Sequence, residues 1–294
     1  SVAYATEQGV AVNVYLEDWS NGMKNSPDYV FQLMDGLRDC GIRRFMLPDT
    51  LGILNPMQVQ EFMGVMVQRY PDTHFDFHGH NDYDLAVSNV YAAVLAGAKG
   101  LHTTINGLGE RAGNAPLASV QAILRDHFGA ETSINEERLN DVSRLVESYS
   151  GITIPANKPI VGENVFTQVA GVHADGDNKN NLYCNELLPE RFGRKREYAL
   201  GKTSGKANIR KNLEALGLEL DDEAMRKVTA RIIELGDKKE VVTQEDLPYI
   251  ISDVLKHSVE DARVKLLSYY VTLSQGLKPM ASLKLSIGDQ VYEQ

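Results

Sequence analysis

Two residue patterns alternate along the first half of the chain. Short runs of β-branched and aromatic residues are typical of strands, and the stretches between them repeat apolar residues at helical spacing. The runs predict strands at Val12–Leu16, Arg44–Leu47, His74–Phe77 and Leu101–Ile105. The stretches predict helices at Pro27–Leu37, Asn55–Gln68, Tyr83–Leu95, Pro116–Arg125 and Asn135–Tyr149.

Polar residues end these predicted strands at a regular interval. Glu17, Thr50, His78 and Asn106 follow one another about 30 residues apart, the length of a strand–helix unit that builds a parallel sheet. Because every strand ends in a polar residue and no glycine-rich dinucleotide turn follows one, a (β/α)8 barrel is favoured over a doubly wound open sheet. Half a barrel cannot close, so either more units precede Ser1 in a longer parent chain or this count is incomplete.

The composition changes after about residue 150. The segment Ile152–Glu186 is rich in Asn, Gly and Pro. Beyond residue 200, helical spacing of apolar residues predicts three helices, at Lys206–Leu216, Asp222–Leu235 and Gln244–His257. Alternating apolar and polar residues predict two strands at Val264–Ser274 and Lys278–Tyr292. These changes predict four domains, at 1–150, 151–200, 201–258 and 259–294.

Composition and charge exclude several classes of protein. With 43% apolar residues the chain can bury a large core, and its formal charge of −10 argues against a nucleic-acid partner. No apolar window approaches the roughly 18 residues of a membrane span, and the first residues do not form a signal peptide. Cys40 and Cys184 alone indicate a reducing compartment, so we expect a cytoplasmic protein that binds neither membrane nor nucleic acid.

The sharpest candidate site is the sequence His78-Gly79-His80. Residues i and i+2 of a strand face the same side, so the two imidazoles can hold one divalent cation. The alternative is a pair of surface or capped histidines. The position at a strand end favours a metal, with Asn81 and Asp82 expected to accept hydrogen bonds from the rings.

Other polar residues offer weaker signals. Glu17 could be a general base, orient a ligand or cap a turn, and the Thr50 hydroxyl could bind a substrate carboxylate or form a turn. The glycines of residues 107–114 (GLGERAGN) allow backbone to approach a ligand, with Glu110, Arg111 and Asn114 as polar contributors. The alternative is a tight loop in which Glu110 and Arg111 pair locally. His74 and His102 are interpreted as structural histidines.

Four motifs together resemble a family of acetyl-CoA-dependent condensing enzymes, the 2-isopropylmalate, citramalate and homocitrate synthases. They are LPDT at 47–50, FHGHND at 77–82, NGLGERAGN at 106–114 and AGVHADG at 170–176. The stretch NVYLEDWSNG at 13–22 is most similar to the citramalate synthases. The resemblance implies the C-terminal half of a (β/α)8 TIM barrel, then mostly helical linker subdomains and the start of an α+β regulatory domain that binds a branched-chain amino acid. It also implies that the first barrel strand, with an Arg-Asp-Gly motif, is missing and that this chain alone is inactive.

The same resemblance implies roles for the candidate residues in the barrel. His78 and His80 would bind Mg²⁺, Mn²⁺ or Zn²⁺, which polarises the carbonyl of a 2-oxo acid. Thr50 would hydrogen-bond the substrate carboxylate, Glu17 would position or deprotonate acetyl-CoA, and Asn114 would support the metal site.

Further roles fall in the polar segment 171–183, which by composition is either solvated or functional. By resemblance, His173 would act in acid–base chemistry at the acetyl methyl group, with Tyr183, Asp175 and Asn181 nearby. In this family the linker of one subunit completes the barrel site of its partner, so a homodimer is implied.

The motifs do not by themselves identify which 2-oxo acid is the substrate. Tyr15 shares a strand face with Glu17, and its bulk would shorten the pocket and favour pyruvate, giving (R)-citramalate for isoleucine biosynthesis. One or two carbons are worth only about 1–3 kcal/mol in an apolar pocket, so 2-isopropylmalate synthase (2-oxoisovalerate, leucine biosynthesis) and homocitrate synthase stay open. Outside the family the alternatives are an amidohydrolase-type barrel, a metal-dependent hydroxyacyl-CoA lyase or a non-catalytic fragment.

Overall fold

The computed structural model describes residues 2–168, 176, 185–202, 204–238, 242–255, 264–272, 280–288 and 290–293. The chain divides into two units. The first unit holds residues 1–167 and 184–197, and the second holds residues 168–183 and 198–294. The unit boundaries that fall within the described residues lie in the two short paired strands β5 (Thr167–Gln168) and β6 (Glu197–Tyr198).

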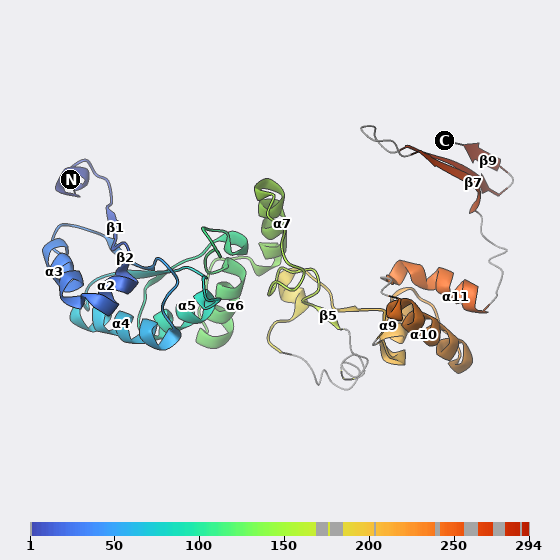
Figure 1. Ribbon diagram of the computed structural model, residues 1–294, viewed down its shortest axis with the longest axis horizontal. Helices are drawn as coiled ribbons and strands as arrows, with labels where there is room; N and C mark the ends of the chain where they lie inside the picture. The colour runs from blue at the N-terminus through green and yellow to red at the C-terminus, as the bar shows by residue number, and fades with distance from the viewer. Residues whose placement is uncertain are drawn as a thin grey trace. The chain divides into compact units, whose positions relative to one another are not determined.

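The first unit is built on a parallel sheet of four strands (Figure 1). The strands lie in chain order, β1 (Asn13–Tyr15), β2 (Arg44–Asp49), β3 (Phe75–Gly79) and β4 (Gly100–His102). This order is that of consecutive strand–helix units, so the α/β class and the parallel sheet are confirmed. β4 stops before the predicted end at Ile105, because residues 105–107 form the 3-10 turn η1 with Asn106 at a φ of 59°.

Most helices of this unit lie close to their predicted positions. These are α3 (Pro27–Leu37), α4 (Pro56–Arg69), α5 (Ala86–Leu95), α6 (Leu117–Phe128) and α7 (Leu139–Ser150). The unit also contains α1 (Val2–Glu7), α2 (Trp19–Asn25) and the 3-10 turns η2 (Glu136–Arg138) and η3 (Pro189–Phe192). A complete capping box starts α4, where Asn55 accepts from the Gln58 N–H at 3.0 Å and Gln58 accepts from the Asn55 N–H at 3.1 Å. The helix predicted from Tyr83 begins only at Ala86, because the Asn81 side chain accepts the Ala86 N–H and holds a turn before it.

The apolar face of the sheet packs on the helices. Phe45 and Leu47 of β2 and Phe75 and Phe77 of β3 are buried in one cluster with helix residues such as Met63. Each such side chain contributes roughly 1.5–3 kcal/mol when it is fully buried. Alternate residues point to the opposite face, which is therefore left for polar side chains.

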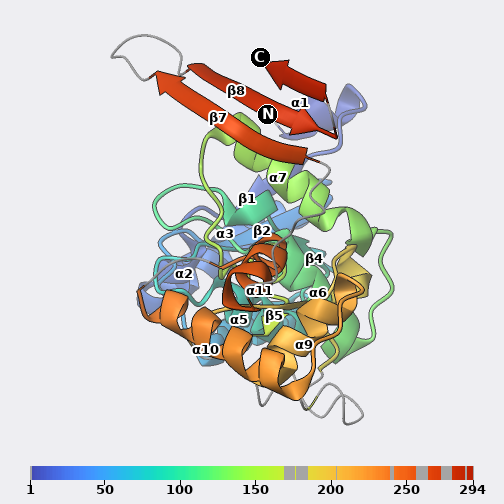
Figure 2. The same cartoon turned by 90° about the vertical axis from the view of Figure 1, so that its right-hand side faces the viewer.

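The second unit contains a helical cluster and an antiparallel sheet. The helices are α9 (Lys206–Ala215), α10 (Asp222–Asp237) and α11 (Leu247–Leu255), which is preceded by the 3-10 turn η4 (Gln244–Asp246) (Figure 2). They bury Ile209, Val228 and Leu247 between them. The three antiparallel strands are β7 (Val264–Thr272), β8 (Met280–Ile287) and β9 (Gln290–Glu293).

The prediction of two terminal strands is wrong, since the second run divides after Ile287. Gly288 has a φ of 61° and leaves the extended conformation, and β9 then pairs back onto β8. Among the residues that the structure describes, no helix is long and apolar enough to cross a membrane.

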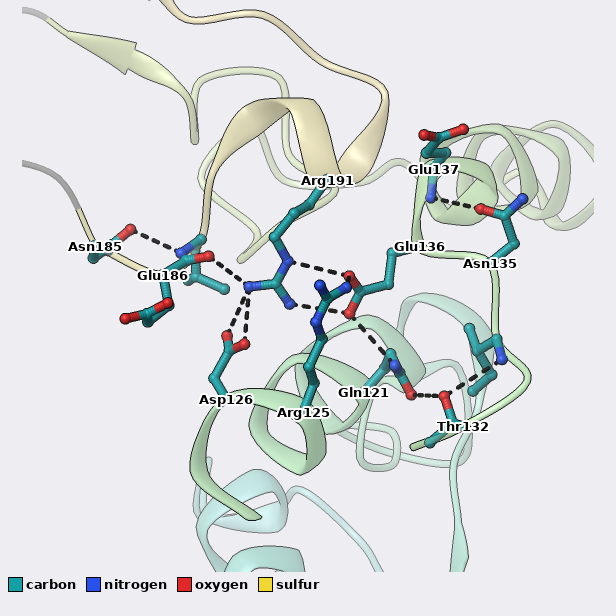
Figure 3. Close-up of polar contacts among 12 residues, drawn as sticks. Gln121, Arg125, Asp126, Thr132, Asn135, Glu136, Glu137, Asn185, Glu186 and Arg191 are labelled. Atoms are coloured by element: carbon teal, nitrogen blue, oxygen red, sulfur yellow. Dashed lines mark hydrogen bonds and ion pairs between the residues drawn. The ribbon is translucent and has the colours of Figure 1, made fainter. Parts of the chain in front are cut away.

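An ion-pair network ties residues 185–197 to the rest of the first unit (Figure 3). Arg191 donates from Nε and Nη2 to the Glu136 carboxylate at 3.1 and 3.0 Å, and from Nη1 to Asp126 at 2.9 Å. Arg125 supplies a second guanidinium to Glu136. The Arg191 and Glu136 side chains are only 12% and 5% exposed. Burial acts to raise the pKa of Glu136, but the hydrogen bonds and charge of Arg191 outweigh it and hold this pKa below its usual range.

Replacing Arg191 with the apolar residue Met should destabilise the first unit. The substitution leaves Glu136 and Asp126 largely buried without their shared partner, and we expect a loss of roughly 2–4 kcal/mol in the free energy of unfolding by urea titration. The matched control is Arg138→Met, which removes an exposed ion pair to Asp141 and should leave stability nearly unchanged. Equal losses in the two variants would contradict the network's role.

Candidate active site

The register of the sheet aligns polar side chains on its second face. Tyr15 pairs with Met46, which pairs with Asp76, and in a later row His78 of β3 pairs with His102 of β4. In parallel strands, paired residues and residues two apart face the same side. Tyr15, Asp76, His78 and His102 therefore share the face opposite the apolar core.

The two imidazoles of the HxH sequence converge. His78 Nε2 lies 3.2 Å from His80 Nε2, and their ring centroids are 4.9 Å apart. Both Nδ1 atoms are buried, and neither has a hydrogen-bond partner among the described residues. The expectation that Asn81 and Asp82 fix these rings is therefore wrong.

Asn81 and Asp82 hold loops instead. The Asn81 side chain caps the start of α5, and Asp82 accepts two hydrogen bonds from Arg111, at 2.7 Å from Nε and 2.9 Å from Nη2. Arg111 also donates from Nη2 to the Thr50 carbonyl at 2.8 Å. The loops after β2 and β3 are thereby joined to the glycine-rich loop.

Glu17 and Thr50 lie together at the carboxyl ends of β1 and β2. The Thr50 hydroxyl donates to Glu17 Oε1 at 2.8 Å and accepts from the Asp18 N–H at 3.0 Å. The preceding residue, Asp49, is buried and accepts the N–H groups of Ile53 and Leu54, so it shapes the turn. Burial raises the pKa of Asp49.

Asn114 closes the glycine-rich loop beside the histidines. It forms a β-bridge with His80, and its side-chain amide donates to the Leu108 carbonyl at 3.1 Å. Gly113 has a φ of 87°, and a Cβ there would overlap the Gly107 carbonyl oxygen, so only glycine fits. The local pair of Arg111 with Glu110 is present, at 3.4 Å, but the stronger contact of Arg111 is with Asp82.

Sequence reasoning missed a cluster around Asp76. This buried carboxylate lies 2.8 Å from His74 Nε2, 3.3 Å from His102 Nε2 and 3.7 Å from Arg44. His102 Nδ1 in turn bonds the Tyr15 hydroxyl at 2.8 Å. The period-two spacing of His74, Asp76 and His78 in one predicted strand was the signal that they share a face.

The electrostatics of this face favour a neutral imidazole and a protonated phenol. Burial lowers the pKa of His78 to about 4, helped by the neighbouring His80 and His102 and opposed by Glu17. Burial, with the charges of Asp76 and Glu17, raises the pKa of Tyr15. A neutral imidazole is the form that binds metal, so His78 suits a cation ligand at neutral pH.

The geometry of the pair also suits a cation. Two nitrogens that bind one ion at about 2.1 Å lie about 3 Å apart when their bonds meet near a right angle. Within the described part of the chain, no third His, Cys, Asp or Glu completes a cluster with them. His173, Asp175, Asn181 and Tyr183 lie outside the described residues.

Comparison with known protein families fits this arrangement. A model described as HMGL-like matches residues 1–146, and one described as homocitrate synthase post-HMGL domain-like matches residues 160–240. Residues 1–146 therefore form an HMGL-like domain. Members of this family have the TIM-barrel fold, and the parallel sheet described above agrees with it.

Three curated relatives of this chain carry three different names. A putative (R)-citramalate synthase of Methanopyrus kandleri is 38% identical and covers 88% of the chain and 50% of the relative. A probable 2-isopropylmalate synthase of the same organism is 36% identical, and the match covers 99% of the chain and 58% of the relative. A homocitrate synthase of Sulfolobus acidocaldarius is 40% identical, and the match covers 79% of the chain and 49% of the relative. The chain thus spans about half the length of the curated relatives it matches.

Folding should lower the titration midpoint of His78. In the metal-free protein we expect the ring to titrate near pH 4 by NMR, against about 6.5 in urea. Because the unfolded chain takes up this proton first, stability should fall as the pH drops from about 6.5 towards 4 and be fully regained above 6.5. His78→Asn should reduce this pH dependence. A folded-state midpoint above 6 would contradict the burial of the ring.

Proposed function

We propose that this chain supplies part of the active site of an acyltransferase that condenses acetyl-CoA with a 2-oxo acid. The observation that carries the proposal is the convergence of His78 and His80 next to Asn114, at the same strand ends as the hydrogen-bonded Glu17 and Thr50. The three names among the relatives support the reaction class and differ in the 2-oxo acid.

The wider arrangement is part of the same proposal. Residues 1–150 would contribute strand–helix units to the barrel, residues 151–200 and 201–258 the linker subdomains, and residues 259–294 the regulatory domain. Two copies would pair, with the linker of one completing the site of the other.

The proposed reaction joins two carbon atoms and then breaks a thioester. The acetyl methyl of acetyl-CoA gives up a proton, the resulting enolate carbon bonds to the ketone carbon of the 2-oxo acid, and the ketone oxygen takes a proton. Water then cleaves the thioester and releases CoA. A divalent cation (Mg²⁺, Mn²⁺ or Zn²⁺) held by His78 and His80 would polarise the ketone as a Lewis acid.

Other residues of the chain would position the substrates and transfer protons. Glu17, fixed by the Thr50 hydroxyl, would position acetyl-CoA or accept the methyl proton, and Thr50 would face the substrate carboxylate. Asn114 supports the metal site through its bridge to His80. In the proposal, His173 moves the proton at the acetyl methyl, with Tyr183, Asp175 and Asn181 beside it.

We propose pyruvate as the 2-oxo acid, giving (R)-citramalate for isoleucine biosynthesis. The Tyr15 ring lies edge-on to His78 with centroids 6.2 Å apart, and in the proposal it would occupy the space into which a longer side chain of the substrate would extend. The methyl group of pyruvate needs less of that space than the isopropyl group of 2-oxoisovalerate.

Removing either histidine should strongly weaken cation binding. In calorimetric titrations with Mn²⁺ or Zn²⁺, His78→Ala and His80→Ala should each weaken affinity by at least about 100-fold. His127→Ala is the matched control, since His127 lies on α6 and packs edge-on against Tyr91 instead. Unchanged affinity in the two site variants would overturn the metal site.

Replacing Tyr15 with Ala should change substrate preference. CoA release would be measured with acetyl-CoA and Mg²⁺ or Mn²⁺, on this chain and on the longest natural chain that contains it. The ratio of kcat/KM for pyruvate over 2-oxoisovalerate should fall by about tenfold or more. Tyr29→Ala, at an exposed position of α3, is the control. An unchanged ratio would contradict the pocket argument.

The unaltered protein separates the candidate functions in the same assay. Faster release with pyruvate supports a citramalate synthase, and faster release with 2-oxoisovalerate supports a 2-isopropylmalate synthase in leucine biosynthesis. Release with neither acid would favour homocitrate synthase or hydroxyacyl-CoA lyase chemistry.

A further inference from the structure

Three side chains from three strands form a hydrogen-bonded chain across the polar face of the sheet. Asp76 of β3 bonds His102 of β4 at 3.3 Å between Oδ2 and Nε2, and His102 Nδ1 bonds the hydroxyl of Tyr15 of β1 at 2.8 Å. β1 and β4 are the first and last strands of this sheet. The bond between Tyr15 and His102 therefore reaches over both strands that separate them.

The backbone makes room for this arrangement at Gly100. Gly100 is the β4 residue paired with Asp76, and a Cβ at this position would overlap the Asp76 carboxylate. Asp76 can consequently lie over β4, where it meets His102. His74 and Arg44 contact the same carboxylate, so its position is fixed from several sides.

The chemistry of the three groups sets the direction of the hydrogen bonds. An ionised carboxylate only accepts, so Asp76 requires a proton on His102 Nε2. In the neutral ring Nδ1 is then an acceptor, and the Tyr15 hydroxyl donates to it. Tyr15 is 47% exposed, so without this bond its ring would be free to swing towards solvent.

We propose that His102 is a positioning residue that sets the size of the 2-oxo acid. Through the Tyr15 hydroxyl, and backed by Asp76, it holds the Tyr15 ring against His78 and keeps the pocket short. The identity of the ligand rests on the proposed condensing function, whereas the hydrogen-bonded chain does not.

NMR of the histidine rings tests the hydrogen-bonded chain without an activity measurement. In long-range ¹H–¹⁵N spectra of the whole chain, His102 should carry its proton on Nε2, and Tyr15→Phe should shift the Nδ1 resonance of His102. His74 is the internal control, because it contacts Asp76 and has no bond to Tyr15, so its resonances should not move. If Tyr15→Phe left the chemical shift of His102 Nδ1 unchanged, the proposal would be overturned.

Ligand titrations on the same samples test the specificity role. With Mg²⁺ present, the ratio of the Kd values for pyruvate and 2-oxoisovalerate should move roughly three- to tenfold towards 2-oxoisovalerate in His102→Leu. His102→Asn keeps an acceptor near the position of Nδ1 and should restore most of the preference, and His74→Leu should retain it. Equal shifts in His102→Leu and His74→Leu would reduce His102 to a structural residue.

The two tests also separate the two proposals. If the unaltered chain binds neither acid, the proposed substrate and the specificity role of His102 both fail, while the ring spectra still decide whether the chain of hydrogen bonds exists. If both acids bind and the spectra show no link to Tyr15, the positioning role alone fails.

Discussion

The alternation of side chains along β3 is the constraint on which the first unit depends. Phe75 and Phe77 point into the helix-covered core, and Asp76 and His78 point to the other face. A slip of one residue in the pairing with β2 would exchange the two sets and bury charged and polar groups among the apolar residues. The cost of burying those groups holds the register, and the register in turn brings His78 beside His102 and Tyr15.

The elements that could be predicted from the sequence are those fixed by local interactions. Asn55 and Pro56 start α4 through a capping box that lies within four residues, and the strand runs in the first half carry their own β-branched and aromatic residues. The start of α5 at Ala86 was missed because it is set by a hydrogen bond to the Asn81 side chain. The break after Ile287 was missed because it is set by the positive φ of Gly288.

Contacts between distant residues could not be predicted in the same way. The convergence of His78 and His80 follows from a spacing of two, but the bonds of Arg111 to Asp82 and of Tyr15 to His102 join residues from different strand–helix units. An arginine in a glycine-rich loop can pair with its neighbour or reach across, and only the folded backbone decides which. Asp82 was expected to bind the histidine rings because it follows them directly in the sequence. In the folded chain it binds Arg111 instead, and this contact could not be predicted from the sequence.

Arg111 has a consequence beyond the geometry of one loop. Its guanidinium binds the Asp82 carboxylate and the Thr50 carbonyl, so it joins the turns that follow two strands to its own loop. Segments tied in this way share one conformational equilibrium, since a displacement of any of them breaks a bond to the others. During evolution, substitutions in the motifs around Thr50, Asp82 and Arg111 would therefore be coupled. Whether a substitution in one motif is tolerated would depend on which residues occupy the other two.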